Sequence, residues 1–494
     1  MNKIFAVALN LHDHNTYDGV FHNQRERFTR FKHNLPYHAE AYDHQSDILN
    51  PGDYRLNDEF VKEYWKKTDD VLAFTYTYGG IRMCKDMLPQ DVFDYEPKKL
   101  WDHYYKNGVY FIDHHQSHAA YAFLNSGYEK SDILAIDGIG SKYRCVFFDK
   151  DENLIDLSDK LPIGWLWNHM SNLTGFGTLG ASKLMGKVGY GKYSEYYYNI
   201  FETILDGPIT EKKQKHFQHI KIDNIDDLAH TLQKFTIDKI KEFVYPLKSC
   251  DNLCIAGGVA YNGYMNEEFT KHYENVFVPP AVGDEGQAVG TYMHADCVIN
   301  NNIHKSETFA GIEYEHNVGE DADYKKIAQE IADGKIVGWF QGKSESGNRA
   351  LGNRSILADP RNPNIKEIIN STIKLREDFR PFAPVVLEEH YKEYFDTRGG
   401  PSPYMSRICK VKTKLVPGVT HVDNTARIQT INRNDNEKFY DIVNEFYKIT
   451  GIPMLLNTSF NCQEPIVEAP HHALRTFRRT ALDLLVINEW IIRK

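Results

Sequence analysis

Short hydrophobic runs recur along the first part of the chain, and glycine or polar residues bound each of them. They lie at residues 3–11 (KIFAVALNL), 71–78 (VLAFTYTY), 108–113 (GVYFID) and 132–138 (DILAIDG). Each run is short and rich in β-branched or aromatic side chains, which is typical of a buried strand. We therefore predict four buried strands before residue 140.

Helical and turn patterns separate and follow these strands. Ser117 predicts the start of a helix that Gly127 closes. Further elements are expected as a hairpin over 143–162, a long amphipathic helix over 226–247, and strand–turn–helix units over 252–266 and 274–295. Strands that alternate with helices indicate an α/β fold.

The pattern weakens at residues 300–322, a polar and asparagine-rich stretch where we place a domain boundary. A second α/β unit follows, with strands predicted at 335–342 (KIVGWFQG) and 453–460 (PMLLNTSF). The predicted domains are residues 1–310 and 311–494. A chain of 494 residues is too long for one ordinary core, which also favours at least two domains.

Composition narrows the function classes. The net charge of -10 and the pI of about 6.1 argue against a broad surface for a polyanion such as nucleic acid. The seven cysteines are scattered and form no CxxC pair, so reduced thiols and a cytoplasmic location are expected. No run approaches the roughly 18 apolar residues of a membrane span, so no membrane partner is expected.

The stretch DHHQSHAAYAF carries the first candidate site. On a helix His114 and His118 share a face, so both imidazoles can bind one ion. Asp137 ends a predicted strand and Asp284 lies in a glycine turn, and both positions project into the crevice of an α/β sheet. Such a set suits Fe(II), Mn(II) or Zn(II); the alternative is that the histidines cap a helix or bond within the core. The metalloprotease motif HExxH is absent from this stretch.

Glycine turns follow two of the predicted strands, in AIDGIG and IAGGVAYNG. Their main-chain N–H groups could hold phosphate oxygens at a helix start. Neither turn is a Walker or GxGxxG motif, and a structural tight turn is the alternative. Lys183 and Lys187 add basic groups to a third glycine-rich stretch, GASKLMGKVGYGKY, which could equally be a solvated loop.

Basic residues concentrate in the second predicted domain. The cluster comprises Arg349, Arg354, Arg361, Lys374, Arg376, Arg380 and Arg427. They lie among glycine, proline and aromatic residues, so ion pairing within helices is a poor explanation. Guanidinium groups match the geometry of phosphate, and the polar run LNTSFN at 456–461 adds neutral donors. We expect a concave anion site, with structural salt bridges as the alternative.

These segments occur together and in order, and in that arrangement the chain resembles the O-carbamoyltransferase family of nodulation and antibiotic-tailoring enzymes, which includes tobramycin carbamoyltransferase. The resemblance rests on RERFTRFKHNLP, DHHQSHAAYAF, AIDGIG, KLMGKVGYG, AGGVAYN, PPAVGDEGQAVG, GNRALGNRSILADPR, REDFRPFAP, HVDNTARIQT and LLNTSFN, which span almost the whole chain. The chain departs from the family at Asn348, where proline is usual, and at Asn424, where glycine is usual.

The resemblance implies an α/β protein with an N-terminal actin-like, sugar-kinase-like (ASKHA) domain that binds metal, followed by a YrdC-like domain. It also implies a reaction in two stages. The second domain would make carbamoyl adenylate from carbamoyl phosphate and ATP, with Mg accompanying ATP, and would release phosphate and pyrophosphate. In the first domain an acceptor hydroxyl would then attack the carbamoyl carbon, and AMP would leave.

The resemblance also implies a role for each candidate residue. Fe(II), with Mn or Zn as alternatives, would be held by His114, His118, Asp137 and Asp284. His12 would take the proton of the acceptor hydroxyl. Nucleotide and carbamoyl phosphate would be bound by Gly138, Gly140, Lys183, Gly257, Gly258, Asn262, Arg349, Arg354, Lys374, Arg376, Arg380, Arg427, Asn457, Thr458, Ser459 and Asn461. Of these, Arg349 and Arg380 would be catalytic.

The acceptor is expected to be a small molecule, a sugar or a hydroxymethylated pyrimidine nucleotide with a free hydroxyl. Polymeric nucleic acid is not expected, and a homodimer is admissible. Two other function classes stay open: a kinase or ATPase of the actin-like fold, and a non-catalytic nucleotide sensor. Neither would release pyrophosphate from ATP in a reaction that depends on carbamoyl phosphate.

Overall fold

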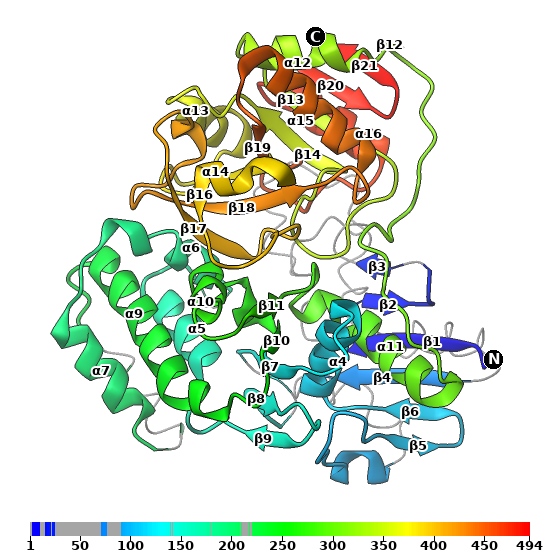
Figure 1. Ribbon diagram of the computed structural model, residues 1–494, viewed down its shortest axis with the longest axis vertical. Coiled ribbons are helices and arrows are strands. Elements are labelled where there is room, and N and C mark those ends of the chain that lie inside the picture. Colours follow the sequence, from blue (N-terminus) through cyan, green and yellow to red (C-terminus); the bar gives the residue numbers. More distant parts are fainter. Residues whose placement is uncertain are drawn as a thin grey trace. The chain divides into compact units, whose positions relative to one another are not determined.

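The computed structural model describes residues 2–9, 15–20, 22–24, 71–76, 90–138, 140, 142–177, 179–207, 209, 217 and 220–494. These residues form two compact units. The first runs to Ser306 without residues 23 and 24, and the second contains those two residues and everything from Glu307 to Lys494. Both units combine helices with sheets (Figure 1), as an α/β fold requires. Within the described ranges, no helix is long and apolar enough to cross a membrane.

The first unit is built on two sheets, one of which also includes residues 23 and 24 of the second unit. One has the strand order β3-β2-β1-β4-β6-β5, with β1 (Ile4–Leu9), β2 (Asn15–Tyr17), β3 (His22–Gln24), β4 (Val71–Tyr76), β5 (Tyr104–Lys106) and β6 (Val109–Phe111). The other has the order β11-β10-β7-β8-β9, with β7 (Asp132–Ile136), β8 (Cys145–Phe148), β9 (Leu154–Asp156), β10 (Asn252–Ala256) and β11 (Asn275–Phe277). The four strands predicted from the hydrophobic runs are confirmed as β1, β4, β6 and β7. In each sheet three strands are parallel, so the segments after their carboxyl ends share one edge.

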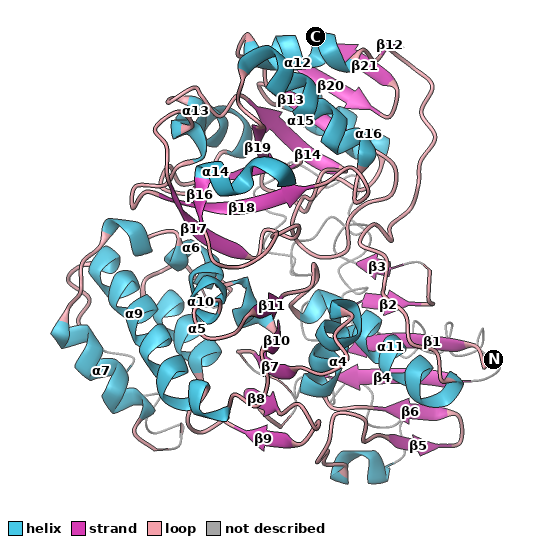
Figure 2. Cartoon of the chain, in the orientation of Figure 1, coloured by secondary structure: helices cyan, strands magenta, loops and turns pink. Residues whose placement is uncertain are grey.

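Helices lie beside both sheets (Figure 2). They are η4 (Gln90–Asp94), α4 (His114–Ser126), α5 (Ile163–Leu173), α6 (Ala181–Met185), η5 (Val188–Tyr190), α7 (Glu195–Leu205), α9 (Ile225–Phe243), η7 (Tyr245–Leu247), η8 (Gly258–Tyr261), α10 (Gly263–Phe269), η9 (Asp284–Gly286) and α11 (Gln287–Asn300). The predicted hairpin is confirmed as β8 and β9, and the long helix as α9 with η7. Helices α4 and α11 approach closely because Gly290 has no side chain: a Cβ there would lie 2.2 Å from the Ser117 carbonyl oxygen.

Helix α4 begins earlier than the sequence pattern predicted. Asp113, and not Ser117, is its N-cap, and Asp113 forms a capping box with Gln116. Ser117 lies inside the helix and donates to the main-chain oxygen of Gln287 at 2.7 Å. Gly127 ends the helix with a φ of 74°, as predicted. The early start makes the first histidine of the motif the first residue of the helix.

The second unit contains a ten-stranded sheet with the order β12-β21-β20-β13-β14-β19-β15-β18-β17-β16. Its strands are β12 (Glu320–Asp321), β13 (Val337–Phe340), β14 (Arg354–Ala358), β15 (Ala383–Leu387), β16 (Phe395–Asp396), β17 (Arg407–Val411), β18 (Thr425–Ile431), β19 (Met454–Ser459), β20 (Leu484–Ile487) and β21 (Trp490–Arg493). Its helices are α12 (Tyr324–Ala332), α13 (Ile365–Ile369), the π-helix η10 (Asn370–Lys374), η11 (Glu388–His390), α14 (Tyr391–Tyr394), η12 (Pro417–Val419), α15 (Glu437–Thr450) and α16 (Pro470–Arg479). The strands predicted at 335–342 and 453–460 are confirmed as β13 and β19.

Candidate active sites

Two histidines and two aspartates meet in the first unit. His114 and His118 lie one turn apart on α4, Asp137 directly follows β7, and Asp284 opens η9. The His114 Nε2 atom is 3.2 Å from Asp137 Oδ2 and 3.3 Å from Asp284 Oδ1. The His118 Nε2 atom is 3.1 Å and 3.5 Å from the same two oxygens. One donor atom from each residue lies within 4.8 Å of all the others, so the four residues could hold one metal ion.

The electrostatics of this group favour positive charge at its centre. Burial lowers the pKa of His114, but the charge of Asp284 and hydrogen bonds to both carboxylates outweigh it and raise the pKa to about 10. Burial raises the pKa of Asp137, but the hydrogen bonds from the two histidines lower it well below its ordinary value. A divalent cation would supply the same positive charge that protons supply here. The nitrogen and oxygen donors fit a first-row divalent ion such as Fe(II), Mn(II) or Zn(II).

Glycines bring the surrounding loops close to Asp137. A Cβ on Gly257, whose φ is 90°, would lie 2.2 Å from the carbonyl oxygen of Ile136. A Cβ on Gly258 would lie 2.9 Å from Asp137 Oδ1. A Cβ on Gly140 would lie 2.1 Å from Cε1 of the His115 ring. The glycine turns predicted to hold a nucleotide therefore lie beside the metal-binding group, although their role in binding stays a prediction.

The other residues predicted for this site differ in their surroundings. Gly138 donates its main-chain N–H to Asp137 Oδ1 at 2.6 Å. Asn262 is the buried N-cap of α10, and its amide nitrogen donates to Gln233 at 2.8 Å. Lys183 is half-buried on α6. His12 and the segment RERFTRFKHNLP lie outside the described residues.

Four of the basic residues from the sequence analysis influence one another's charge in the second unit: Arg349, Lys374, Arg376 and Arg380. Burial lowers the pKa of Arg380, the charge of Glu377 partly offsets this, and the charge of Arg349 lowers the pKa further. Burial, and then the charge of Arg380, lower the pKa of Arg376 to about 9. Burial, and then the charge of Arg376, lower the pKa of Lys374 well below its ordinary value. Because the cations are desolvated and repel one another, an anionic ligand would stabilise all four.

Neutral groups orient this cluster. The Lys374 ammonium donates to Asn461 Oδ1 at 2.7 Å and to Ser459 through both its hydroxyl, at 3.1 Å, and its carbonyl oxygen. Arg376 donates from Nε to the side chain of Asn370 at 2.7 Å and stacks on Phe382. Thr458 is half-buried at the end of β19. The run LNTSFN thus contributes two residues that contact a cation of the cluster.

Three further residues predicted to bind the ligand make contacts within the protein. Arg354 is fully buried, stacks on Phe340, and donates to the main-chain oxygens of Gln341, Gly342, Asn353 and Glu468. Asn457 is buried and donates to Ala350 and Gln429. Arg427 is half-buried and donates to the carbonyl oxygen of Met405 at 3.3 Å. Arg361 pairs with Asp359 at 2.6 Å, as the salt-bridge alternative had proposed.

Two asparagines that the sequence analysis missed connect these sites to the fold. Asn15 donates to the carbonyl oxygen of Asp284 at 2.8 Å and accepts from the main chain of Ala288. Asn370 accepts from Arg376 and donates to the carbonyl oxygen of Arg380 at 3.1 Å. Neither asparagine belongs to a recognisable motif, so no signal in the single sequence could have identified them.

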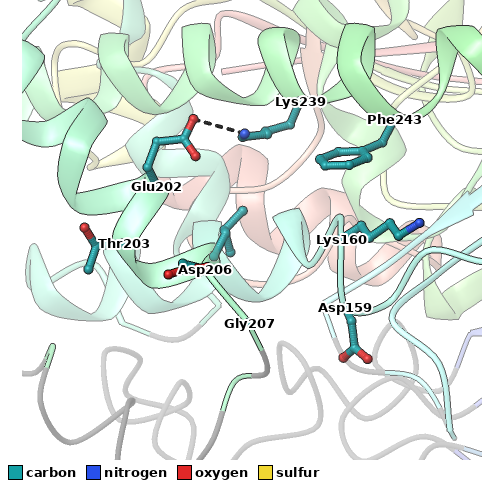
Figure 3. A pocket seen from close by; sticks show the side chains of 9 residues that line it. Asp159, Lys160, Glu202, Thr203, Asp206, Gly207, Lys239 and Phe243 are labelled. Atoms are coloured by element: carbon teal, nitrogen blue, oxygen red, sulfur yellow. Dashed lines mark ion pairs between the residues drawn. The ribbon is translucent and has the colours of Figure 1, made fainter.

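A cavity of about 560 Å³ lies between α7 and α9 (Figure 3). Lys239 of α9 reaches Glu202 of α7 across it, at 3.0 Å. The residues that line it are Asp159, Lys160, Glu202, Thr203, Leu205, Asp206, Gly207, Lys239 and Phe243. None of the predicted site residues is among them, so the cavity is separate from both clusters.

Comparison with known protein families identifies the class of enzyme. Residues 18–293 match the family described as carbamoyltransferase N-terminus, and residues 328–494 match carbamoyltransferase C-terminus. The two matches define an enzyme that transfers a carbamoyl group. The chain belongs to the carbamoyltransferase family.

Individual relatives show how far the similarity extends along the chain. Nodulation protein NolNO of Sinorhizobium fredii is 34% identical over 440 residues, which are 78% of this chain and 64% of NolNO. An uncharacterized protein of Methanocaldococcus jannaschii is 31% identical over 524 residues, with 96% of each chain covered. The 3'-hydroxymethylcephem-O-carbamoyltransferase of Streptomyces clavuligerus is 34% identical over 221 residues, or 42% of each chain. The solved structure of HypF from T. kodakarensis aligns with 61% of this chain over 48% of its own length, at 13% identity. The TM-score of 0.31 is too low to support a conclusion about the fold.

Proposed function

We propose that the protein is an ATP-dependent O-carbamoyltransferase that works in two stages. In the first stage carbamoyl phosphate, water and ATP give carbamoyl adenylate, phosphate and pyrophosphate. In the second stage an acceptor hydroxyl attacks the carbamoyl carbon, and AMP leaves. The observation that carries the proposal is that a family member has a cluster of buried cations in one compact unit and a group that could hold a metal ion in the other.

The second unit, which we propose to be YrdC-like, carries out activation. Carbamoyl phosphate and ATP bring many negative oxygens, and Arg349, Arg376 and Arg380 supply fixed positive charge to bind them. Desolvation strengthens this attraction, because charges interact more strongly in a low-dielectric site. Ser459 and Asn461 keep Lys374 in place beside the arginines. The positive charges of the arginines also neutralise the charge that develops on the leaving pyrophosphate.

The first unit, which we propose to have the ASKHA fold, carries out transfer. A divalent ion bound there, which we propose to be Fe(II), would act as a Lewis acid toward the carbamoyl oxygen. His114, His118, Asp137 and Asp284 would hold it. The glycine turns beside Asp137 would hold the nucleotide of carbamoyl adenylate. His12 would accept the proton of the attacking hydroxyl.

The acceptor is proposed to be a small molecule, a sugar or a hydroxymethylated nucleotide. The Streptomyces clavuligerus relative is named for an acceptor with a hydroxymethyl group, which supports a primary alcohol as the group that is modified here. The negative net charge of -10 also favours a small acceptor over a polyanion.

Removal of a single arginine tests where activation occurs. Arg349→Ala or Arg380→Ala removes a charge-assisted contact with phosphate, which costs about 2–5 kcal/mol, or roughly 30- to several-thousand-fold in rate. We expect pyrophosphate release from ATP and carbamoyl phosphate to fall by that factor. Transfer from supplied carbamoyl adenylate should continue at the wild-type rate. Normal pyrophosphate release by either variant would show that activation takes place elsewhere.

A further inference from the structure

The carboxylate of Glu345 holds the main chain of the loop that carries Arg349. Its Oε1 atom accepts hydrogen bonds from the main-chain N–H groups of Leu351 at 2.8 Å, Asn353 at 2.9 Å and Arg354 at 3.0 Å. Glu345 is fully buried. Convergent N–H groups of this kind form an anion-binding nest. The protein fills the nest with its own carboxylate, so these three N–H groups are occupied.

The carbonyl groups of the same loop are held from the opposite direction. Asn457 donates to the carbonyl oxygen of Ala350 at 3.0 Å, and Gln429 donates to that of Leu351 at 2.9 Å. The two amides also bond to each other at 2.7 Å, and both are buried. The main chain from 350 to 354 is therefore fixed on both sides. Arg349, the residue before it, lies close enough to Arg380 for its charge to lower the pKa of that guanidinium.

We propose that Glu345 is a positioning residue for the binding of carbamoyl phosphate. Glu345 fixes the loop 347–354, and the fixed loop keeps Arg349 beside Arg380. This inference rests on the anion site of the proposed function. The inference also gives two parts of the motif GNRALGNR different roles. Main-chain N–H groups bind the internal carboxylate of Glu345, and the side chain of Arg349 binds the ligand. A carboxylate holds the loop more strongly than a neutral acceptor would. Three N–H groups converge on one oxygen, and hydrogen bonds to an ionised acceptor are about twice as strong as neutral ones.

The test measures carbamoyl phosphate binding by titration calorimetry without ATP. We expect Glu345→Ala to weaken binding at least tenfold and Glu345→Gln, which keeps a neutral acceptor oxygen, to have an intermediate effect. Formate at millimolar concentration should restore most of the affinity of Glu345→Ala, because it can refill the nest. The matched control is Glu315→Ala, which removes an exposed glutamate of the same unit and should bind like the wild type.

A double variant shows whether Glu345 acts through Arg349. Arg349→Ala alone should weaken binding, and adding Glu345→Gln should weaken it no further. Wild-type affinity in a folded Glu345→Ala protein, or losses that multiply in the double variant, would overturn the inference. If Glu345→Ala does not fold, Glu345→Gln alone must weaken binding for the inference to stand. Failure of the proposed function itself is read separately, as absence of pyrophosphate release by the wild type.

Discussion

At the residue scale, two arginines of one motif have opposite surroundings. Arg354 is fully buried and donates to four main-chain oxygens, whereas Arg349 is half-buried next to Arg380. In the sequence GNRALGNR both follow asparagine, so the pattern predicted an anion contact for each. Burial and the positions of main-chain carbonyls separate them, and neither can be read from residue types. For the histidine and aspartate group, by contrast, helical spacing and strand ends were sufficient.

The metal-binding group gives the first prediction at this scale. His114→Ala or His118→Ala removes one of two nitrogen donors, so bound metal should fall to the background measured by elemental analysis. Carbamoyl transfer should be lost with it. Pyrophosphate release should continue, because the activation residues lie in the other unit. Wild-type metal content in a protein that carries both His114→Ala and His118→Ala would contradict the proposal that these residues bind a metal ion.

A buried histidine outside both sites gives a pH prediction. His294 is fully buried, and its ring nitrogens form hydrogen bonds with the Tyr110 hydroxyl at 2.7 Å and the Leu100 carbonyl oxygen at 2.8 Å. Burial lowers the pKa of His294 to about 4. An unfolded histidine titrates near pH 6.5, so protons favour the unfolded chain below that value. The free energy of unfolding should fall by about 2–3 kcal/mol as the pH drops from about 6.5 to 4.

Urea denaturation across this pH range measures the effect. His294→Gln cannot take up the proton, so its stability should be lower but should depend less on pH. An equally steep decline in the variant would assign the pH dependence to other groups.

At the element scale, strand positions were predictable and the meeting of distant segments was not. Short runs predicted β1, β4, β6 and β7 because each is rich in β-branched or aromatic residues and is bounded by glycine or polar residues. The start of α4 was missed because Asp113 also reads as the end of a strand. The anion cluster joins residues from the loop after Glu345, from η10 and from the end of β19, and hydrophobic periodicity carries no information about that proximity.

The contact between α4 and α11 gives a prediction about these elements. Gly290→Ala would place a methyl group 2.2 Å from the Ser117 carbonyl oxygen, so the helices must separate. Overpacking of this kind costs about 1–3 kcal/mol of stability. Because α4 carries both histidines, metal affinity should fall as well. Thermal unfolding and metal titration measure the two effects.

Gly400→Ala serves as the control for this variant. Nothing lies within 4 Å of a Cβ at Gly400, so that substitution should leave both stability and metal affinity unchanged. Wild-type stability and metal affinity in Gly290→Ala would show that the close helix contact does not position the histidines.

At the scale of the whole molecule, the order of many weak motifs predicted the enzyme class, and the family matches over residues 18–293 and 328–494 confirm it. The acceptor could not be predicted in the same way. Acceptor recognition depends on the shape of a pocket rather than on a motif that transfers between relatives, and the resemblance covers enzymes with different acceptors.

Competition between acceptors tests the proposed preference for a small one. Hydroxymethylated duplex DNA, the matching free nucleotide and an aminoglycoside are offered together with ATP and carbamoyl phosphate, and carbamate formation on each is measured by mass spectrometry. We expect product on the nucleotide or the aminoglycoside, because the net charge of -10 disfavours a broad surface for a polyanion. Efficient modification of the duplex with none of the nucleotide would reverse this expectation.

The central claim is that carbamoyl transfer passes through an adenylate, and the stoichiometry of the reaction tests it most directly. Purified protein is incubated with ATP, carbamoyl phosphate and an acceptor that it modifies, and pyrophosphate, AMP and carbamoylated product are quantified together. The two-stage reaction predicts one pyrophosphate and one AMP for each carbamate formed. Carbamoylated product formed without pyrophosphate, or at the same rate without ATP, would contradict it.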